Sequence, residues 1–453
     1  MIERFRRHKA AIVFLAILSC LLSGCASRKA YVETNNPEAC DPIGAKTAAW
    51  KEPFQLALSG GGYRAVLFHV GALWRLNELG MLPRLERVSS VSGGSIVAGV
   101  LAATWNQLDF DENGVGRCFY KKVVTPLLQF TDHTIDSPAI ISGLLPFVSA
   151  AGQLERSYQR LLFGNLMLSE LPSRPAFIFN ATNFQTGAVW HFTREYMGDA
   201  SIGVVLNPEI SLAQVITASS AYPPLLAPYE LTLNDSEWVP PPVQEGASIL
   251  QSVPIPKTEV GEFRKKVILI DGGVGDNLGL ESLWERRQHI MVSDGGSGLR
   301  NISEPSLNWA GQTLRIIDMI HDQPSKLRTK ILIDAFKQRK RCENAVECKH
   351  PDGVYWGIQG PAAWHKDVSA PDVPIEHIRS LAEIGTRLKS LDECTKRRLI
   401  NWGYLAVDRS LPYLNGLWSF ENGEWRWHYT SLKLPFPAAD LAETVGKECL
   451  KPH

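Results

Sequence analysis

Two strand–turn–helix units follow one another near the beginning of the chain, and they constrain the fold more than any other feature of the sequence. Phe54–Leu58 is a short apolar run that ends in three consecutive glycines, and apolar residues at helical spacing then continue to Leu79, before Gly80. Leu85–Val91 is a second apolar run, and a segment rich in small residues, 93–105, follows it. A strand that leads directly into a helix, twice in succession, predicts a parallel sheet covered by helices.

Four further short apolar runs predict more strands of the same sheet, and these are residues 176–180, 188–192, 266–270 and 289–293. The last two are each followed by a glycine-rich turn, as is expected of buried strands in an α/β sheet. Residues 229–262 contain three consecutive prolines and predict a loop insertion. We therefore predict an α/β fold with three layers, α/β/α, around a mostly parallel central sheet.

The last third of the chain is predicted to be helical over residues 307–341 and then rich in loops. Residues 418–427 predict a β-hairpin that turns at Asn422-Gly423, a pair that two-residue hairpin turns favour. Since no second domain has signals of its own, residues 51–300 are predicted to form the main domain. Residues 301–453 are predicted to be a C-terminal extension packed on that domain.

The N-terminus has the pattern of an export signal. Residues 1–9 are basic and residues 10–22 are apolar, and this apolar run is too short to span a bilayer. It ends in Leu-Ser-Gly followed by Cys25, which resembles the lipobox of bacterial lipoproteins. We expect residues 1–24 to be a lipoprotein signal peptide, Cys25 to carry acyl chains such as palmitate, and residues 25–50 to be a tether. The alternative is an ordinary secretory peptide that is cleaved slightly later.

These features predict a lipid-anchored protein of the bacterial cell envelope that faces the periplasm. Ala26 follows Cys25 where an Asp would retain a lipoprotein in the inner membrane, which favours the outer membrane. The formal net charge is zero, so the sequence does not support nucleic-acid binding. No protein partner is indicated.

The cysteine count agrees with an oxidising compartment. Eight cysteines are present; cleavage would remove Cys20 and acylation would use Cys25, which leaves six that can pair. Cys342 and Cys348 are close enough in the sequence to close a small disulfide loop. No pair of cysteines has the spacing of a structural zinc site and no histidine cluster accompanies them, so we expect no metal.

A glycine-rich loop, Ser59-Gly60-Gly61-Gly62-Tyr63-Arg64-Ala65, joins the first predicted strand to the first predicted helix. Consecutive glycines let several backbone N–H groups point at one place, and the helix N-terminus adds positive potential, so the loop suits an anion. That anion is either a phosphate or the oxyanion of an acyl-transfer intermediate. The loop formally fits a dinucleotide-binding fingerprint, but the next strand ends without the acid that such a site needs, and no Gly-Lys-Ser/Thr follows the glycines. The oxyanion is therefore favoured.

Ser92 follows the second predicted strand, at the N-terminus of the second predicted helix. A nucleophile elbow requires small residues two positions before and two positions after its serine. Gly94 meets this requirement, and Ser90 replaces the usual glycine with another small residue. Ser95 is a rival nucleophile, but Val97 stands where it would need a glycine. The alternative function of Ser92 is a helix N-cap, and the glycine-rich loop upstream favours the nucleophile.

Asp271 follows the predicted strand 266–270 in the sequence Asp-Gly-Gly. Ligands of open α/β sheets bind beyond the carboxyl ends of the strands, so a carboxylate there can reach the hydroxyl of Ser92. Asp294 repeats the Asp-Gly-Gly pattern one strand later and is a competing candidate for the base. Either aspartate could instead be a turn former.

Together these blocks resemble the patatin-like phospholipase family, whose members share a glycine-rich oxyanion loop, a serine elbow and a downstream Asp-Gly-Gly or Asp-Gly-Ala. The order of the blocks matches over residues 54–300. Asp271 is followed by Asn277 as in the family, whereas Asp294 has no such asparagine, which favours Asp271. Residues 219–223 match a further family block, in which a serine precedes a Pro-containing turn. Three positions depart from the family pattern, and these are Ser59, Ala65 and Ser90.

The resemblance implies a patatin-like fold and a serine lipid acyl hydrolase of phospholipase or lysophospholipase type that acts on membrane lipids without a cofactor. It implies a catalytic dyad in which Asp271 takes the proton of Ser92 directly. Gly60, Gly61 and Gly62 would form the oxyanion hole, and Arg64 would add positive charge or bind a phosphate head group.

Two alternatives stay open. A Ser–His–Asp triad would use His69, His191 or His289, which lie within the α/β part of the chain. A catalytically decayed lipoprotein that binds lipid or a partner would be consistent with Ser90 and with the C-terminal third, which matches no known block.

Overall fold

The computed structural model describes most of the chain between residues 52 and 436. The described residues are 40, 52–143, 148–233, 237–241, 255–256, 258–284, 289–296, 299, 302–342, 348, 350–360, 373–411, 418–421, 424–427 and 434–436. The predicted signal peptide, Cys25 and the predicted tether, Cys40 excepted, lie outside the described residues. The predicted loop insertion is described only in part.

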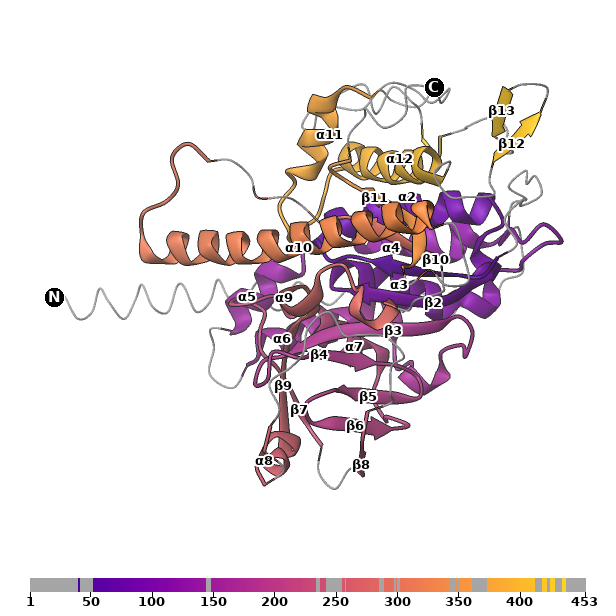
Figure 1. Cartoon of the computed structure of the whole chain (residues 1–453). Coiled ribbons are helices and arrows are strands. Elements are labelled where there is room, and N and C mark those ends of the chain that lie inside the picture. The colour runs from indigo at the N-terminus through magenta and orange to yellow at the C-terminus, as the bar shows by residue number, and fades with distance from the viewer. Residues whose placement is uncertain are drawn as a thin grey trace.

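Five parallel strands form the centre of the sheet, in the order β11-β10-β1-β2-β3 (Figure 1). Their bounds are β1 Phe54–Leu58, β2 Leu85–Val91, β3 Ala176–Asn183, β10 His289–Asp294 and β11 Asp352–Gly357. The four of these strands that were predicted from apolar runs are all present, and β1 and β2 have the predicted bounds.

Antiparallel strands extend this centre beyond β3. One branch continues from β3 through β4, β5, β6 and β8, and the other through β9 and β7. Their bounds are β4 Val189–Phe192, β5 Tyr196–Asp199, β6 Gly203–Leu206, β7 Tyr229–Thr232, β8 Trp238–Val239 and β9 Lys266–Asp271. The predicted strands 188–192 and 266–270 are therefore present, and both belong to the antiparallel part.

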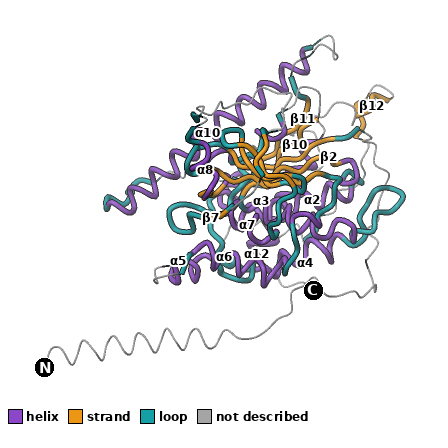
Figure 2. The backbone as a smooth tube through the Cα atoms, turned by 90° about the horizontal axis from the view of Figure 1, so that it is seen from below, coloured by secondary structure: helices purple, strands orange, loops and turns teal. Residues whose placement is uncertain are grey.

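Helices cover both faces of the sheet, as Figure 2 shows. One face packs against α2 (Gly62–Glu78), α3 (Gly93–Thr104) and α7 (Leu212–Ser220), with α12 (Glu393–Ser410) outside α2. The other face packs against α10 (Trp309–Arg341), whose Leu332 and Phe336 share a buried cluster with strand residues. This is the predicted three-layer α/β/α architecture.

The alternation of side chains along β1 separates the two cores. Leu56 and Leu58 belong to the larger cluster beneath α2 and α3, whereas Ala57 between them belongs to the smaller cluster beneath α10. Successive residues of a strand point to opposite faces, and β1, although it contains buried Gln55, contributes apolar side chains to both cores.

The remaining helices surround this framework. Their bounds are α4 Thr125–Phe130, α5 Asp136–Gly143, α6 Ala150–Tyr158, α8 Val260–Lys265, α9 Gly272–Asp276 and α11 Ile375–Ala382. The predicted hairpin is present as β12 (Trp418–Glu421) paired antiparallel with β13 (Glu424–Trp427). None of the helices in the described ranges is both long enough and apolar enough to cross a bilayer.

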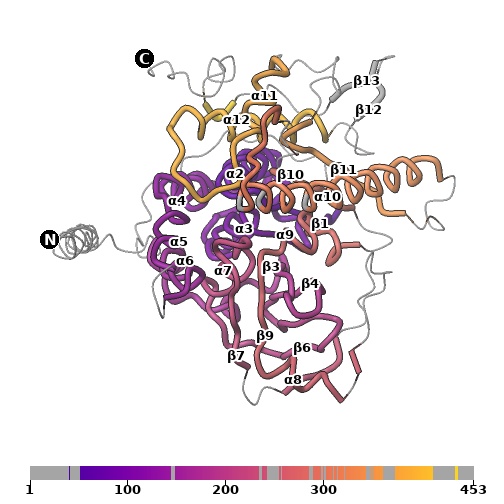
Figure 3. The backbone as a smooth tube through the Cα atoms, turned by 90° about the vertical axis from the view of Figure 1, so that its left-hand side faces the viewer, coloured from indigo at the N-terminus to yellow at the C-terminus, as the bar shows by residue number. Residues whose placement is uncertain are grey.

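The C-terminal part of the chain completes the fold. β11 pairs with β10, so the predicted boundary at residue 300 falls between two neighbouring strands of one sheet. α12 lies along α2 (Figure 3), where buried Arg75 donates hydrogen bonds to Asp408 and to the hydroxyl of Tyr404. A buried guanidinium that is paired in this way ties α12 firmly to α2, because loss of either partner would leave a buried charge uncompensated.

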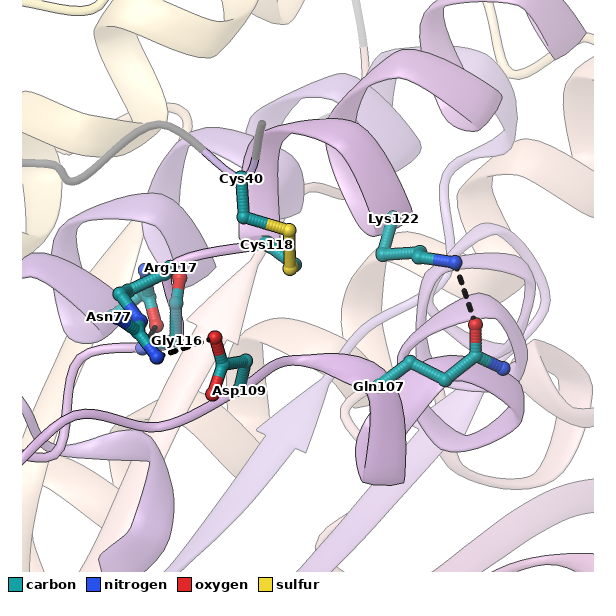
Figure 4. The surroundings of a disulfide bond; sticks show 8 residues. All are labelled: Cys40, Asn77, Gln107, Asp109, Gly116, Arg117, Cys118 and Lys122. Atoms are coloured by element: carbon teal, nitrogen blue, oxygen red, sulfur yellow. Dashed lines mark hydrogen bonds and ion pairs between the residues drawn. A yellow bond between two sulfur atoms is a disulfide. The ribbon is translucent and has the colours of Figure 1, made fainter. Parts of the chain in front are cut away.

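Two disulfides lie within the described residues. Cys342–Cys348 is the predicted small loop, and Cys40–Cys118 attaches the segment before β1 to the main domain. Figure 4 shows the second bond beside the ion pair of Arg117 with Asp109. Cys394 is also disulfide-bonded.

Candidate active site

Ser92 lies in a strained turn between β2 and α3. Its φ of 50° and ψ of −116° are unusual for a residue with a side chain, and such backbone strain is typical of a nucleophile elbow. The turn is crowded, because a Cβ placed on Gly94 would lie 2.3 Å from the carbonyl oxygen of Leu58. Ser90, which departs from the family pattern, fits without disturbing the turn because its hydroxyl is hydrogen-bonded to Ser95.

β2 and β9 share one edge of β3. β4 pairs with residues 179–182 of β3, and these include residues that pair with β2 and residues that pair with β9. A strand residue has one neighbour on each edge, so β4 lies on one edge of β3, and β2 and β9 lie on the other. Val91 at the end of β2 pairs with Asn180, and Asp271 at the end of β9 pairs with Ala181 from the opposite direction. The carboxyl ends of the two strands therefore meet, and this brings Asp271 to Ser92.

The carboxyl group of Asp271 is buried and lies close enough to the hydroxyl of Ser92 for that hydroxyl to lower its pKa. It also accepts a hydrogen bond from the N–H of Gly273 at 2.7 Å. Burial raises the pKa of Asp271 to about 6, although the hydroxyl of Ser92 and the N–H of Gly273 oppose the shift. A carboxylate with this pKa is ionised at neutral pH and basic enough to accept a proton from a hydroxyl in a transition state.

The glycine-rich loop runs against the nucleophile. A Cβ placed on Gly60 would lie 3.2 Å from the Cβ of Ser92. The N–H of Gly60 donates to the carbonyl oxygen of Asn277 at 3.1 Å, whereas within the described ranges the N–H groups of Gly61 and Gly62 have no protein acceptor. The first N–H groups of a helix have no partner within the helix, so these two are available to an anion at the N-terminus of α2.

Arg64 lies in the same loop, but its guanidinium is buried and bound to the protein. It donates to the carbonyl oxygens of Gly295 and Ile384 and to the hydroxyl of Thr386. This arrangement joins the loop to the turn after β10 and to the C-terminal part of the chain. It leaves Gly61 and Gly62 as the donors in the loop that can hold an oxyanion.

Residues 384–387 support the glycine-rich loop, which the sequence did not indicate. The carbonyl oxygen of Arg387 accepts a hydrogen bond from the N–H of Tyr63 at 3.0 Å. The side chain of Arg387 is in turn paired with buried Asp136 of α5, which lowers the pKa of Asp136 although burial acts in the opposite direction. The C-terminal part of the chain therefore positions the loop next to Ser92.

Ser219 supports the elbow from α7. Its buried hydroxyl accepts a hydrogen bond from the N–H of Ser92 at 3.0 Å and donates one to the carbonyl oxygen of Asn180 at 2.7 Å. It also lies 2.8 Å from the hydroxyl of Ser95. The sequence pattern identified the block that contains Ser219, but only the structure reveals this role.

The competing candidates have other partners. The hydroxyl of Tyr355 donates to Asp294 at 2.7 Å, and the N–H of Gly296 donates to it at 2.9 Å. Buried His69 is bound between Ser293 and Ser59, and burial lowers its pKa to about 4. These contacts assign Asp294 and His69 to the support of the turn after β10.

The two other histidines lie elsewhere on the sheet. His191 of β4 is hydrogen-bonded through Nδ1 to the side chain of Asn180, and burial lowers its pKa to about 4. His289 begins β10, at the amino end of the parallel strands, where it faces Asp352 at 3.6 Å. The carboxyl group that lies beside the hydroxyl of Ser92 is that of Asp271.

The model of the patatin-like phospholipase family matches residues 56–284, which include the glycine-rich loop, Ser92 and Asp271. The match covers half of the chain, and the chain belongs to the patatin-like phospholipase family. Its fold is the patatin-like α/β/α fold. No curated protein sequence gives a significant match.

Among solved structures, human GIVD cytosolic phospholipase A2 is similar to this chain, with 12% identity and a TM-score of 0.45. The similarity covers 79% of this chain and 59% of that protein. VipD from Legionella pneumophila is similar with 17% identity and a TM-score of 0.35, over 79% of this chain and 66% of that protein. This chain therefore spans less than two thirds of either structure.

Proposed function

We propose that this chain is a serine lipid acyl hydrolase in which Ser92 is the nucleophile and Asp271 its general base. The observation that carries the proposal is the buried carboxyl group of Asp271 beside the hydroxyl of Ser92 at a strained elbow. The N–H groups of Gly61 and Gly62 beside the elbow support an oxyanion hole. Membership of the patatin-like phospholipase family supports a lipid ester as the substrate.

The proposed reaction has two steps. In the first, Ser92 Oγ attacks the ester carbonyl carbon while Asp271 takes its proton, and the N–H groups of Gly61 and Gly62 stabilise the tetrahedral oxyanion. The intermediate collapses to an acyl-enzyme, and Asp271 returns the proton to the leaving alcohol. In the second step Asp271 removes a proton from water, which attacks the acyl-enzyme; the intermediate collapses, the fatty acid is released, and Asp271 returns the proton to Ser92 Oγ. No cofactor takes part in this scheme.

We propose phospholipids or lysophospholipids of the cell envelope as the substrates. The predicted acylation of Cys25, which lies outside the described residues, would hold the enzyme at its substrate. Incorporation of radiolabelled palmitate into the chain, and its loss in Cys25→Ser, would test the anchor. Lack of incorporation into the unmodified chain would contradict it.

The decayed-site alternative is not favoured by the structure of the elbow. Ser90 motivated it, yet the hydroxyl of Ser90 is hydrogen-bonded and Ser92 keeps the strained backbone of an elbow. An activated serine also reacts with fluorophosphonates, whereas a decayed one does not. Labelling of the full chain with a fluorophosphonate probe, followed by peptide mapping, therefore tests the proposal directly.

We expect the probe to label Ser92, and we expect Ser92→Ala to abolish both labelling and ester hydrolysis. Asp271→Asn should slow both by about 10²–10⁴-fold, which is the usual contribution of a general base. Asp294→Asn is the matched control, since Asp294 is also an aspartate of an Asp-Gly-Gly turn and burial raises its pKa too. A loss of labelling in Asp294→Asn with full labelling in Asp271→Asn would overturn the assignment of the base.

A further inference from the structure

The long helix α10 carries a stripe of exposed apolar side chains. We call Trp309, Ile316, Ile320, Leu327 and Ile331 the apolar stripe, and these side chains are between 38% and 81% exposed. Their spacing of seven, four, seven and four residues keeps them within about 60° of one direction on a helix of 3.6 residues per turn. Single exposed apolar residues are common, but a continuous row on one side of a helix marks an interaction surface.

The stripe is separate from the face through which α10 packs on the sheet. Leu332, Ala335 and Phe336 near the C-terminal end of α10 are buried. The N-terminal part of α10 extends beyond the body of the molecule, as Figures 1 and 3 show. The stripe therefore faces outward along the projecting part of the helix.

α10 is attached to the rim of the candidate active site. Asp318 is hydrogen-bonded to the hydroxyl of Tyr222. The pKa of Tyr222 is raised mainly by burial, and the nearby carboxylate of Asp271 also contributes to the increase. Arg328 binds the carbonyl oxygen of Gly275 and lies 3.5 Å from Asp276, in the short helix that follows Asp271. The stripe and the site are therefore held in a fixed relation by contacts on either side of Pro324.

Three further apolar residues near α10 or near residues that it contacts are exposed. Leu225 follows the turn at Tyr222, and Val274 lies three residues after Asp271; both side chains are exposed. Leu307, just before α10, is also exposed. Exposed apolar side chains close to these contacts suit an apolar partner rather than bulk water.

The charge of α10 favours a negatively charged partner. The helix contains eight Lys and Arg residues and three Asp residues. Exposed Lys326, Lys330 and Lys337 follow one flank of the stripe; Lys326 and Lys337 are ion-paired with Asp322 and Asp334, which leaves the helix with a net positive charge. An apolar face that contains Trp and Leu beside a basic flank is the pattern of a helix that lies in the interface of an anionic membrane.

We propose that the apolar stripe of α10 inserts into the boundary between head groups and acyl chains of an anionic phospholipid bilayer. The lysines of its flank would then lie at the level of the lipid phosphates, and Trp309 would lie at the interface that Trp prefers. This docking would also bring Ser92 to its lipid substrate, and that part of the inference rests on the proposed lipid hydrolase function. The docking itself does not depend on catalysis.

The test places a reporter on the stripe itself. Ile316→Cys in the full chain, with Cys20→Ser, Cys25→Ser and Ser92→Ala, is labelled with a polarity-sensitive fluorophore and mixed with phosphatidylcholine vesicles with or without phosphatidylglycerol. We expect a blue shift of emission and protection from aqueous iodide when phosphatidylglycerol is present. Leu206→Cys on β6 is the matched control, since Leu206 is 52% exposed and Ile316 is 53% exposed, and it should show neither effect.

Two outcomes would overturn the proposal. One is an unchanged emission at position 316 with every vesicle, and the other is a blue shift without vesicles that follows dimer formation, which would assign the stripe to a second copy of the chain.

The link to hydrolysis is tested separately in the catalytically intact chain. Ile316→Asp with Leu327→Asp should lower the ratio of vesicle hydrolysis to soluble-ester hydrolysis by about tenfold or more, because two buried apolar side chains are lost from the membrane contact. If neither substrate is hydrolysed, the proposed function fails while the fluorescence result still decides the docking.

Discussion

Ser92 and Asp271 are neighbours because β2 and β9 approach each other along one edge of β3 and end there. Val91 and Asp271 pair with the consecutive residues Asn180 and Ala181. The backbone hydrogen bonds of a sheet therefore set the separation of the two side chains, rather than the conformation of a long loop. Such a rigid support is what a proton transfer requires, since the base must stay within hydrogen-bonding distance of the hydroxyl.

The first prediction concerns pH. Asp271 must be ionised to accept the proton of Ser92, and burial raises its pKa to about 6. We expect kcat/KM for a soluble ester to be constant above about pH 7 and to fall about tenfold per pH unit well below pH 6, with a midpoint near the pKa of the free enzyme. The measurement is a pH–rate profile over the range in which the protein stays folded. If the midpoint of the pH–rate profile disappears in His191→Gln, the base is His191 rather than Asp271.

The second prediction concerns the stability cost of this carboxylate. The pKa of Asp271 in the folded chain is above its ordinary value of 3.8, so the folded state binds the proton more tightly than the unfolded state. Its contribution to stability is complete below about pH 4 and is lost as the pH rises through about 6. Asp271→Asn removes this loss of folding stability, because asparagine does not ionise and its side-chain oxygen can still accept hydrogen bonds.

We therefore expect Asp271→Asn to unfold at higher denaturant concentration than the unmodified chain at neutral pH. The gain should be at most about 3 kcal/mol, because one pKa unit corresponds to about 1.36 kcal/mol. The difference should shrink towards zero near pH 4. Urea unfolding at both pH values measures it, and a variant that is less stable at neutral pH would contradict the assignment of a strained, charged Asp271.

The local elements of the fold could be predicted from the sequence because their signals are local. Phe54–Leu58 and Leu85–Val91 are apolar runs bounded by turn residues, and their predicted bounds agree with the structure. Ser92 was predicted from the small residues around it, and Asp271 was preferred to Asp294 because Asn277 follows it as in the family that the sequence resembles. What these signals do not contain is the direction of β9, because a strand is parallel or antiparallel only with respect to a partner elsewhere in the chain.

The contacts that support the glycine-rich loop could not be predicted for a similar reason. Arg64 was expected to face the substrate, but its donors are bound to residues as distant in the sequence as Ile384 and Thr386. The N–H of Gly60 was expected to serve the oxyanion, but it is bound to Asn277. Each of these contacts joins segments that have no common periodicity or motif, so only the folded chain reveals them.

The third prediction concerns Ser219 as a positioning residue. Its hydroxyl accepts the N–H of Ser92 and so helps to hold the backbone at a φ of 50°. Ser219→Ala would leave this buried N–H without an acceptor, which should destabilise the fold by about 1–3 kcal/mol. We expect kcat to fall by about ten- to a hundredfold with little change in KM, because the nucleophile is displaced while the lipid-binding surface is intact.

The control for Ser219 is Ser157→Ala in α6. The hydroxyl of Ser157 is bound to the carbonyl oxygen of Gln153 and touches no residue of the site. This variant should retain the kcat of the unmodified chain. If Ser219→Ala lowers stability as expected but leaves kcat and the rate of fluorophosphonate labelling unchanged, Ser219 has only a structural role.

The fourth prediction concerns Gly62, where the glycine-rich loop and the C-terminal part of the chain are in contact. Gly62 has a φ of 61°, and a Cβ placed on it would lie 2.5 Å from the carbonyl oxygen of Arg387. Gly62→Ala must therefore displace either the start of α2 or residues 384–387. Since the N–H of Gly62 is a proposed oxyanion donor, we expect kcat to fall by about 10²–10³-fold, the usual effect of losing one such donor.

Gly152→Ala is the matched control for Gly62→Ala. Gly152 is also in the first turns of a helix, but a Cβ placed on it has its nearest neighbour at 3.7 Å. This variant should keep full activity and gain up to about 1 kcal/mol of stability from the higher helix propensity of alanine. Steady-state hydrolysis of a soluble ester, measured on variants shown to be folded by circular dichroism, separates the two cases. Full activity in folded Gly62→Ala would mean that the oxyanion is held elsewhere, because the loop cannot accept a Cβ there and keep its N–H in place.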